Sequence, residues 1–297
     1  MNKLILLVGL PGAGKSTYAH RLMEQLTESS LWLSSDSIRK ELYGDESIQG
    51  DPNKVFRVMH QRARASLTDG VTVIYDATNV NRKSRKQIIS IAKALRVTIE
   101  AHIVWCPYEI CLQRDVTRDR VVGEGIIKRF LYRWETPYYD EGIDTIVLVN
   151  TDSNHDYTTY ENRLVNEMRI PHENPHHTAS VWQHCLNAHC DASNNSNDLV
   201  VISASLYHDI GKPMTKFYDE KSSEESPLAH YYNHQNVGGY LALGLYECPK
   251  QNDFAIDVSW LITNHMEPFF NSTYYKNLSG VEKTRVDSLH SFDLNAH

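Results

Sequence analysis

Leu4-Ile5-Leu6-Leu7-Val8-Gly9-Leu10-Pro11-Gly12-Ala13-Gly14-Lys15-Ser16-Thr17 opens the chain and decides the fold of its first half. Leu4 to Val8 are bulky and uniformly apolar, as in a central parallel strand that is buried on both faces. Gly9 to Ser16 then match the pattern G-x-x-x-x-G-K-[ST] without a mismatch, in the strand-to-helix setting that the pattern requires. The stretch therefore predicts a nucleoside triphosphate site in an α/β domain.

The residue types of this loop suit a phosphate chain. Its glycines let backbone N–H groups converge on phosphate oxygens, and the positive end of the following helix adds to the field. We expect Lys15 to reach the β- and γ-phosphates, Ser16 to offer its hydroxyl to Mg²⁺, and Pro11 to stiffen the loop.

Composition limits the class of protein. With 297 residues the chain has room for two domains, because one core serves about 100–200 residues. A net charge of −7 argues against broad nonspecific adhesion to DNA or RNA. The five cysteines include no C-x-x-C pair, and the first residues predict a strand rather than a signal peptide, so we expect a reducing, cytoplasmic compartment. No run approaches the ~18 apolar residues of a membrane span.

Four further strands are expected to join the first in a doubly wound parallel sheet. They cover Leu31–Ser35, Val71–Tyr75, Thr98–Trp105 and Asp144–Asn150. Asp36 and the run Asp76-Ala77-Thr78-Asn79 follow two of these strands, at the sheet edge where ligands bind in such folds. Asp36 is either a helix N-cap or a carboxylate that accepts the proton of an acceptor hydroxyl. The basic residues Arg82, Lys83, Arg85 and Lys86 form either a solvated helix face or a phosphate-binding patch.

About the first 150 residues resemble the polynucleotide 5′-hydroxyl kinase family. The resemblance lies in the phosphate loop together with two segments, Ser35-Asp36-Ser37-Ile38-Arg39 and Asp76-Ala77-Thr78-Asn79. The resemblance implies that Asp36 activates a 5′-hydroxyl, that Arg39 holds the neighbouring 3′-phosphate, and that Arg118 contacts the phosphates of ATP. Related small-molecule kinases share the loop. The ATP-binding residues implied are Gly9, Pro11, Gly12, Ala13, Gly14, Lys15, Ser16, Thr17, Arg114 and Arg118.

A polar stretch over 150–175 predicts a boundary near residue 168, which gives a domain over 1–168 and another over 169–297. Helical periodicity follows in Ser180–His189 and Leu199–Tyr207, with a short polar loop expected over Asp191–Asn197. Separate helical segments then present a set of imidazoles and carboxylates: His184, His208, Asp209, His234, His265 and Asp293. Such a mixed N/O pocket suits Mn, Fe, Co, Ni or Zn, and metal-bound water would be the nucleophile.

Alternatives remain within this set, because His230 competes with His234 and Asp287 with Asp293. The order H…HD…K…H…H…D resembles the HD phosphohydrolase superfamily, most specifically in Leu206-Tyr207-His208-Asp209-Ile210-Gly211-Lys212-Pro213. The resemblance implies an all-α domain in which His184, His208, Asp209 and Asp293 hold one metal. It further implies that His234 and His265 hold a second metal and that Lys212 contacts a substrate phosphate. His176 and His177 are either substrate contacts or surface histidines.

The two halves together resemble bifunctional RNA end-healing enzymes, which phosphorylate a 5′-OH end and remove a 2′,3′-cyclic or terminal phosphate. This implies ATP and Mg²⁺ for the kinase, Mn²⁺, Ni²⁺, Co²⁺ or Zn²⁺ for the HD domain, and RNA or DNA ends as substrate. It also implies an RNA ligase in the same pathway, no membrane and a possible homo-oligomer. A small-molecule kinase fused to a nucleotide phosphohydrolase is the alternative, and a nucleotide-gated module without hydrolase activity is a third.

Overall fold

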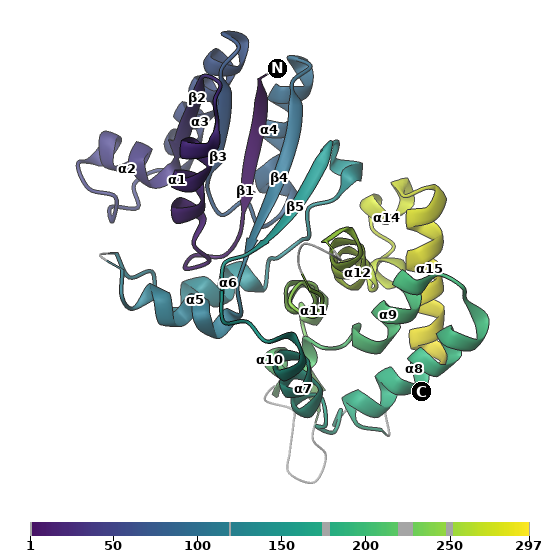
Figure 1. Ribbon diagram of the computed structural model, residues 1–297. Coiled ribbons are helices and arrows are strands. Elements are labelled where there is room, and N and C mark those ends of the chain that lie inside the picture. Colours follow the sequence, from purple (N-terminus) through teal and green to yellow (C-terminus); the bar gives the residue numbers. More distant parts are fainter. Residues whose placement is uncertain (1, 119, 174–178, 219–227, 248–251, 297) are drawn as a thin grey trace. The chain divides into compact units, whose positions relative to one another are not determined.

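A computed structural model describes all residues except 1, 119, 174–178, 219–227, 248–251 and 297 (Figure 1). Its contacts divide the chain into a first unit, Met1–Phe130 with Pro137–Ser153, and a second, Leu131–Thr136 with Asn154–His297. The division differs from the boundary expected near residue 168, because helix α7 (Tyr157–Glu167) belongs to the second unit. There the Tyr160 hydroxyl donates to the carbonyl of Leu241 at 3.3 Å.

The first unit contains a five-stranded parallel sheet in the order β2-β3-β1-β4-β5 (Figure 1). All five predicted strands are present, with ends shifted by one residue at most. Strand β1 is central, since Leu4 lies opposite both Val73 of β3 and Ile99 of β4, and it is buried on both faces as expected. The strands are β1 (Lys3–Val8), β2 (Ser30–Ser34), β3 (Thr72–Asp76), β4 (Thr98–Trp105) and β5 (Thr145–Asn150).

Helices cover both faces of this sheet. On one face, Ala19 of α1 packs with Ile5, Leu7 and Ile74. On the other, the His60 ring of α3 stacks on Tyr75, which points away from Ile74 because strand side chains alternate. The helices are α1 (Lys15–Gln25), α2 (Ser35–Tyr43), α3 (Pro52–Thr68), α4 (Arg82–Ala94), α5 (Tyr108–Asp115), α6 (Glu124–Leu131) and the short 3₁₀ helix η1 (Tyr139–Glu141).

The second unit is mainly helical. The all-α prediction needs correction, because two-residue strands β6 (Phe217–Tyr218) and β7 (Ala229–His230) pair as an antiparallel ladder. The loop expected over Asp191–Asn197 begins only at Ser196, because Ala188 and Ala192 continue the buried face of α8 up to its end at Asn195. Its helices are α7, α8 (Val181–Asn195), α9 (Leu199–Tyr207), α10 (Lys212–Thr215), α11 (His234–Ala242), α12 (Asn252–Asn264), α13 (Glu267–Phe270), α14 (Thr273–Asn277) and α15 (Gly280–Asn295).

Six residues that interrupt the first unit in sequence, Leu131–Thr136, belong to the core of the second. Trp134 is fully buried, and its carbonyl accepts a hydrogen bond from Asn236 at 2.6 Å. The Thr136 hydroxyl lies 2.7 Å from that of Ser259 in α12. This segment therefore contributes to the core that supports α11 and α12.

Across the described part of the chain, none of the helices combines the length and the apolar character that a membrane span requires.

Candidate functional site

The phosphate loop joins β1 to α1 through glycines in the left-handed region. Gly12 has φ 82° and Gly14, the N-cap of α1, has φ 87°. A Cβ on Gly12 would lie 2.3 Å from the Cys111 carbonyl oxygen, so only glycine fits there. The Lys15 ammonium donates to the carbonyls of Gly9 (3.0 Å) and Leu10 (2.8 Å) across the mouth of the loop. Burial lowers the pKa of Lys15, with the carboxylate of Asp76 acting in the opposite direction.

Ser16 and Asp76 meet at the end of β3. The Ser16 hydroxyl donates to the Asp76 carboxylate at 3.2 Å, and the Trp32 indole N–H donates to the same oxygen at 3.2 Å. Burial raises the pKa of Asp76, with the Lys15 cation opposing the shift. A hydroxyl beside a carboxylate is the oxygen pair that Mg²⁺ takes in phosphate-loop enzymes. Sequence reasoning placed Asp76 at the correct edge but did not include it among the metal ligands.

Asp36 lies in the first turn of α2 with two guanidinium groups on one of its oxygens. Ser34, and not Asp36, is the N-cap, since its side chain accepts the N–H of Asp36. Arg39 donates to Asp36 from one turn along the helix, and Arg120 donates to the same oxygen at 2.9 Å. Arg39 is buried, whereas the Asp36 side chain is 38% exposed and therefore open to an acceptor. Arg120 is a contact that the prediction did not include, since it selected only Arg114 and Arg118 from the arginine-rich stretch over 114–120.

The two arginines that the resemblance implied to bind ATP, Arg114 and Arg118, have different surroundings. Arg114 donates to the hydroxyl and the carbonyl of Thr151, each at 2.9 Å, and that hydroxyl donates to the Ala13 carbonyl at 2.9 Å. Arg114 therefore stabilises the phosphate loop indirectly, through Thr151 and its hydrogen bond to Ala13. Arg118 is 37% exposed in its side chain and lies 3.7 Å from Asp115.

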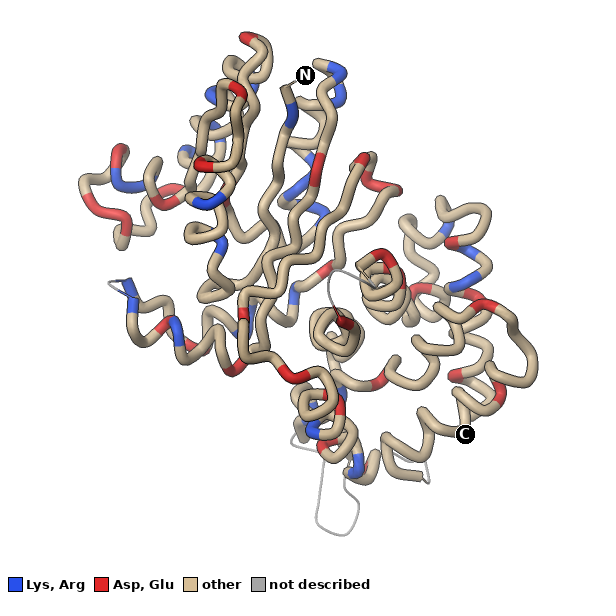
Figure 2. Tube along the Cα trace, viewed as in Figure 1, with Lys and Arg blue, Asp and Glu red and all other residues tan. Residues whose placement is uncertain are grey.

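Helix α4 carries Lys and Arg along its length (Figure 2). Arg85 is nevertheless fully buried and makes a two-pronged ion pair with Glu141, at 2.7 and 2.8 Å. Arg82 pairs with Asp140 at 2.9 Å. These two arginines therefore serve the packing of the first unit, and neither interpretation made from the sequence describes Arg85.

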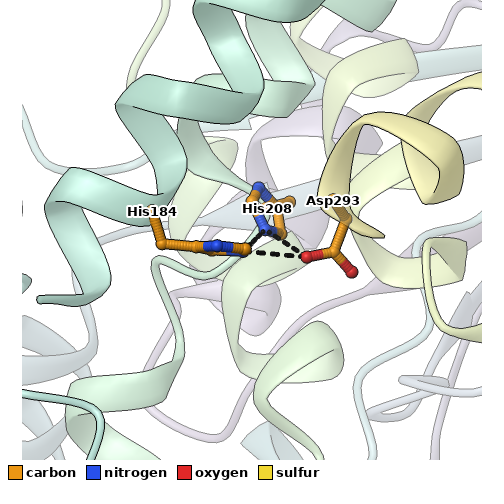
Figure 3. Close-up of side chains that lie close together, drawn as sticks. All are labelled: His184, His208 and Asp293. Atoms are coloured by element: carbon orange, nitrogen blue, oxygen red, sulfur yellow. Dashed lines mark hydrogen bonds and ion pairs between the residues drawn. The ribbon is translucent and has the colours of Figure 1, made fainter. Parts of the chain in front are cut away.

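In the second unit, the histidines and aspartates predicted as metal ligands come together although they lie on different helices. His184 of α8, His208 at the end of α9 and Asp293 of α15 point at one another (Figure 3). The Nε2 atoms of His184 and His208 are 3.1 Å apart, and each lies within 3.2 Å of an Asp293 oxygen. A second group forms from Asp209, His234 at the start of α11 and His265 after α12, with the two Nε2 atoms 3.2 Å apart.

Asp209 lies between the two groups rather than with the first alone. One of its oxygens is 3.3 Å from His234, and the other is 3.5 Å from His208 and 3.7 Å from His184. Its position therefore permits it to bridge two metals. Burial alone would raise the pKa of Asp209, but the cationic Lys212 and the neighbouring imidazoles hold it well below its ordinary value.

The hydrogen bonds of the imidazoles test whether a metal fits. Nδ1 of His208, His234 and His265 each faces the backbone carbonyl three residues earlier, at 2.9, 2.8 and 2.7 Å. With the proton on Nδ1, Nε2 carries a lone pair directed into the cluster, which is the usual tautomer of a metal-bound histidine. Burial lowers the pKa of His234 to about 4 and that of His265 to about 3, so both are neutral near pH 7. The donor set therefore fits a divalent transition metal.

Two neighbours complete this cluster. Lys212 donates to Asp209 at 2.6 Å and lies 3.2 Å from Nε2 of His172, a buried residue that the prediction did not include. No sequence pattern distinguished His172 from its neighbours in the polar stretch. His230 lies in β7 and Asp287 accepts a bond from Tyr275, so the structure brings His234 and Asp293 into the cluster instead. His176 and His177 lie outside the described residues.

Comparison with known proteins agrees with the fold of the first unit. Residues 4–137 match a family model described as an AAA domain. An L-seryl-tRNA(Sec) kinase of Methanococcus maripaludis is 27% identical over 181 residues, which cover 58% of this chain and 66% of that protein. A probable adenylyl-sulfate kinase of Bacillus subtilis is 26% identical over 175 residues, 55% of this chain and 83% of that protein. The chain thus spans just under two thirds of the first of these relatives.

Among solved structures, one titled as a Pnkp1/Rnl/Hen1 complex matches with a TM-score of 0.36 and 23% identity, covering 52% of this chain and 48% of that one. Kti12 of Chaetomium thermophilum with ADP-AlF3 matches with a TM-score of 0.40 and 20% identity, covering 51% and 90%. The phosphate loop and the parallel sheet define the first unit as a P-loop domain, and its similarity to kinases indicates phosphoryl transfer of the kinase type.

Proposed function

We propose that the chain heals nucleic-acid ends: the first unit phosphorylates a 5′-hydroxyl, and the second removes a 2′,3′-cyclic or terminal phosphate. The observation that carries the proposal is the buried His/Asp cluster of the second unit, because phosphoryl transfer by the first unit has no use for it. A chain that combines phosphoryl transfer with phosphate removal is suited to a nucleic-acid substrate in which both ends need repair.

In the first unit, Asp36 would accept the proton of the 5′-hydroxyl as the γ-phosphoryl group is transferred. Its half-exposed carboxylate stands at the carboxyl edge of the sheet, and buried Arg39 orients it from the same helix. Arg39 would also meet the acceptor's neighbouring phosphate. Lys15 and the two further arginines, Arg118 and Arg120, would neutralise charge on the nucleotide.

In the second unit, the two groups that share Asp209 would hold one or two divalent metals. When bound, such a metal polarises a phosphate oxygen and supplies a water nucleophile near neutral pH. The residues of the chain orient the imidazoles through backbone carbonyls and keep Asp209 ionised beside Lys212. Lys212 is already paired with Asp209, so it would contact a substrate phosphate while keeping this ion pair.

Exposed aromatic rings next to this cluster favour a nucleic-acid substrate. Phe217, His230 and Tyr232 lie ring against ring with centroids 5.3–5.5 Å apart, and Tyr232 is 63% exposed. Tyr232 is two residues from His234, so its Cα is within about 7 Å of that residue's Cα. Stacking of a base on such rings contributes about 1–3 kcal/mol.

The test is incubation with ATP, Mg²⁺, Mn²⁺ and a short RNA that bears a 5′-OH and a 2′,3′-cyclic phosphate, with both ends followed by mass spectrometry. Asp36→Ala should abolish phosphorylation and leave phosphate removal intact, and Asp209→Ala should do the reverse. Asp287→Asn serves as the control, since this carboxylate lies outside the cluster. Loss of both activities in either folded variant would contradict two separate sites, and no change at either RNA end would reject the proposal. Joining of the treated RNA by an added RNA ligase would show that the ends are healed.

A small-molecule kinase fused to a nucleotide phosphohydrolase is the second candidate. The similarity to a protein named adenylyl-sulfate kinase favours it, because that name specifies a small acceptor. This candidate predicts that a mononucleoside is phosphorylated as efficiently as an oligonucleotide of the same 5′-terminal base.

A further inference from the structure

A groove of about 720 Å³ runs between α3 and α4 of the first unit, apart from the phosphate loop. Helix α3 lines it with residues spaced three and four apart, which places them on one face of the helix. The α4 side is neutral, with Gln87, Ser90 and Ile91. The α3 side includes Phe56, Arg57, His60 and Arg64, and the complete lining contains no carboxylate.

Three polar side chains along this groove, those of Arg57, His60 and Arg64, lack a hydrogen-bond or ion-pair partner among the residues that the structure describes. Arg57 and Arg64 are exposed, and within the described residues neither guanidinium has an ion pair. Nε2 of His60 has no hydrogen-bond partner in the described structure, although the side chain is only 9% exposed. Arg62 on the same helix differs, because Glu41 of α2 neutralises it at 2.5 Å. A buried polar atom without a partner costs free energy that a ligand can recover, so the groove is suited to an anion.

The first turns of α3 lie at the same edge of the sheet as the kinase site. Helix α3 runs antiparallel to β3, since it ends at Thr68 just before that strand begins, so its first turns lie at the edge where β3 ends. The His60 ring stacks on Tyr75 with centroids 5.9 Å apart, and Tyr75 directly precedes Asp76. A strand whose 5′ end lies at Asp36 could therefore continue along α3.

We infer that this groove binds the phosphodiester backbone of the acceptor strand beyond its 5′-terminal nucleotide. The inference rests on the proposed function and adds the path of the substrate. Arg57 and Arg64 are two helical turns apart, about 10 Å along the axis, so two separate phosphates are needed to meet both. Phe56, with its ring 6.3 Å from that of His60, offers an aromatic face to a base. Free nucleotide or inorganic phosphate shares the anionic chemistry, and the experiment separates these sources.

The experiment compares wild type, Arg57→Gln/Arg64→Gln and the control Arg62→Gln with 5′-OH oligonucleotides of increasing length. For long oligonucleotides, the double variant should raise KM about 10-fold or more at unchanged kcat, whereas the dinucleotide should behave as with wild type. Binding of a labelled oligonucleotide, measured by anisotropy, should lose about 1.4 from the slope of log K against log salt, because each phosphate contact contributes about 0.7. Arg62→Gln should leave all three quantities unchanged.

The possible outcomes distinguish failure of the proposed groove from failure of the proposed kinase function. Phosphorylation of oligonucleotides with a KM that depends neither on length nor on Arg57 and Arg64 would overturn the groove and leave the kinase assignment standing. Binding of inorganic phosphate or ADP that requires Arg57 and Arg64 but leaves the labelled strand bound would assign the groove to a free ligand and also overturn the inference. If no oligonucleotide is bound or phosphorylated, the proposed function and the inference both fall.

Discussion

The buried ion pair between Arg85 and Glu141 gives a sharp prediction for the stability of the first unit. Arg85 is fully buried and the Glu141 side chain is 7% exposed. Arg85 also donates to the Asn79 carbonyl at 2.9 Å, and the Asn79 amide donates to Leu7 at 2.8 Å, just before the phosphate loop. Replacing Arg85 by Met leaves the carboxylate of Glu141 buried without its cation.

Removing one partner of a buried ion pair typically costs about 3–5 kcal/mol, because the remaining charge loses its compensation away from water. We therefore expect Arg85→Met to lower the free energy of unfolding of the first unit by that amount. Arg85→Met/Glu141→Leu should recover most of the loss, since buried ion pairs replaced by apolar side chains are often neutral in stability.

The assay is urea unfolding, with the transition of the first unit identified by its shift to higher urea when ATP and Mg²⁺ are added. Arg62→Met is the matched control, because its ion pair with Glu41 is about half exposed on both sides. The reasoning is refuted if Arg85→Met moves the transition no more than Arg62→Met does. It is equally refuted if the double variant is less stable than Arg85→Met.

Three further predictions follow from the sites and their packing. Asp76→Asn should lower the rate of phosphorylation about 10²-fold or more and raise the Mg²⁺ concentration needed for half-maximal activity. Trp32→Phe removes only one hydrogen-bond donor to the Asp76 carboxylate, so it should change both quantities less. Equal effects of the two variants in a magnesium titration would contradict this prediction. In metal-free protein, the second unit should lose stability as pH falls from about 6.5 to 4, because His234 and His265 take up protons in the unfolded state near 6.5 but in the folded state only at about 4 and about 3. The raised pKa of His208 offsets part of this loss. Urea midpoints that do not fall over this range would reject the prediction. Gly239→Ala should destabilise the second unit by about 1–3 kcal/mol, since the added Cβ would lie 2.0 Å from the Thr263 hydroxyl. The control Gly125→Ala in α6 adds a Cβ that meets no atom within 4 Å, so it should be neutral or stabilising. Thermal unfolding measures both effects.

The features that could be predicted from the sequence are those with a local signal. The phosphate loop is contiguous, and two of its glycines, Gly12 and Gly14, have positive φ angles that favour glycine locally. The strands were recognised because Leu4 to Val8 of β1 are uniformly apolar and because β3 and β4 are rich in β-branched and apolar residues, as is typical of central strands in a parallel sheet. In the second unit, the His208-Asp209 pair and its spacing from the other histidines indicated the residues that gather in space.

The features that escaped prediction depend on neighbours that are remote in sequence. Arg85 reads as part of a basic helix face, and only its contact with Glu141, 56 residues on, shows that it is buried. Arg114 and Arg120 are equivalent in an arginine-rich stretch, yet one reaches Thr151 and the other Asp36. The ladder of β6 and β7 was missed because two residues per strand carry no periodic signal.

The sequence alone determined that a phosphate loop follows a buried strand and that a parallel sheet surrounds it, and it indicated a set of histidines and aspartates suited to a metal site, with His230 and Asp287 left as alternatives. These follow from chemistry and spacing along the chain. Only the tertiary structure decided that Asp209 lies between two groups of imidazoles, that Lys212 is paired with it, and that Asp76 faces Ser16. Those relations depend on how separate helices and strands pack, because a side chain's pairing is set by what lies across the core from it.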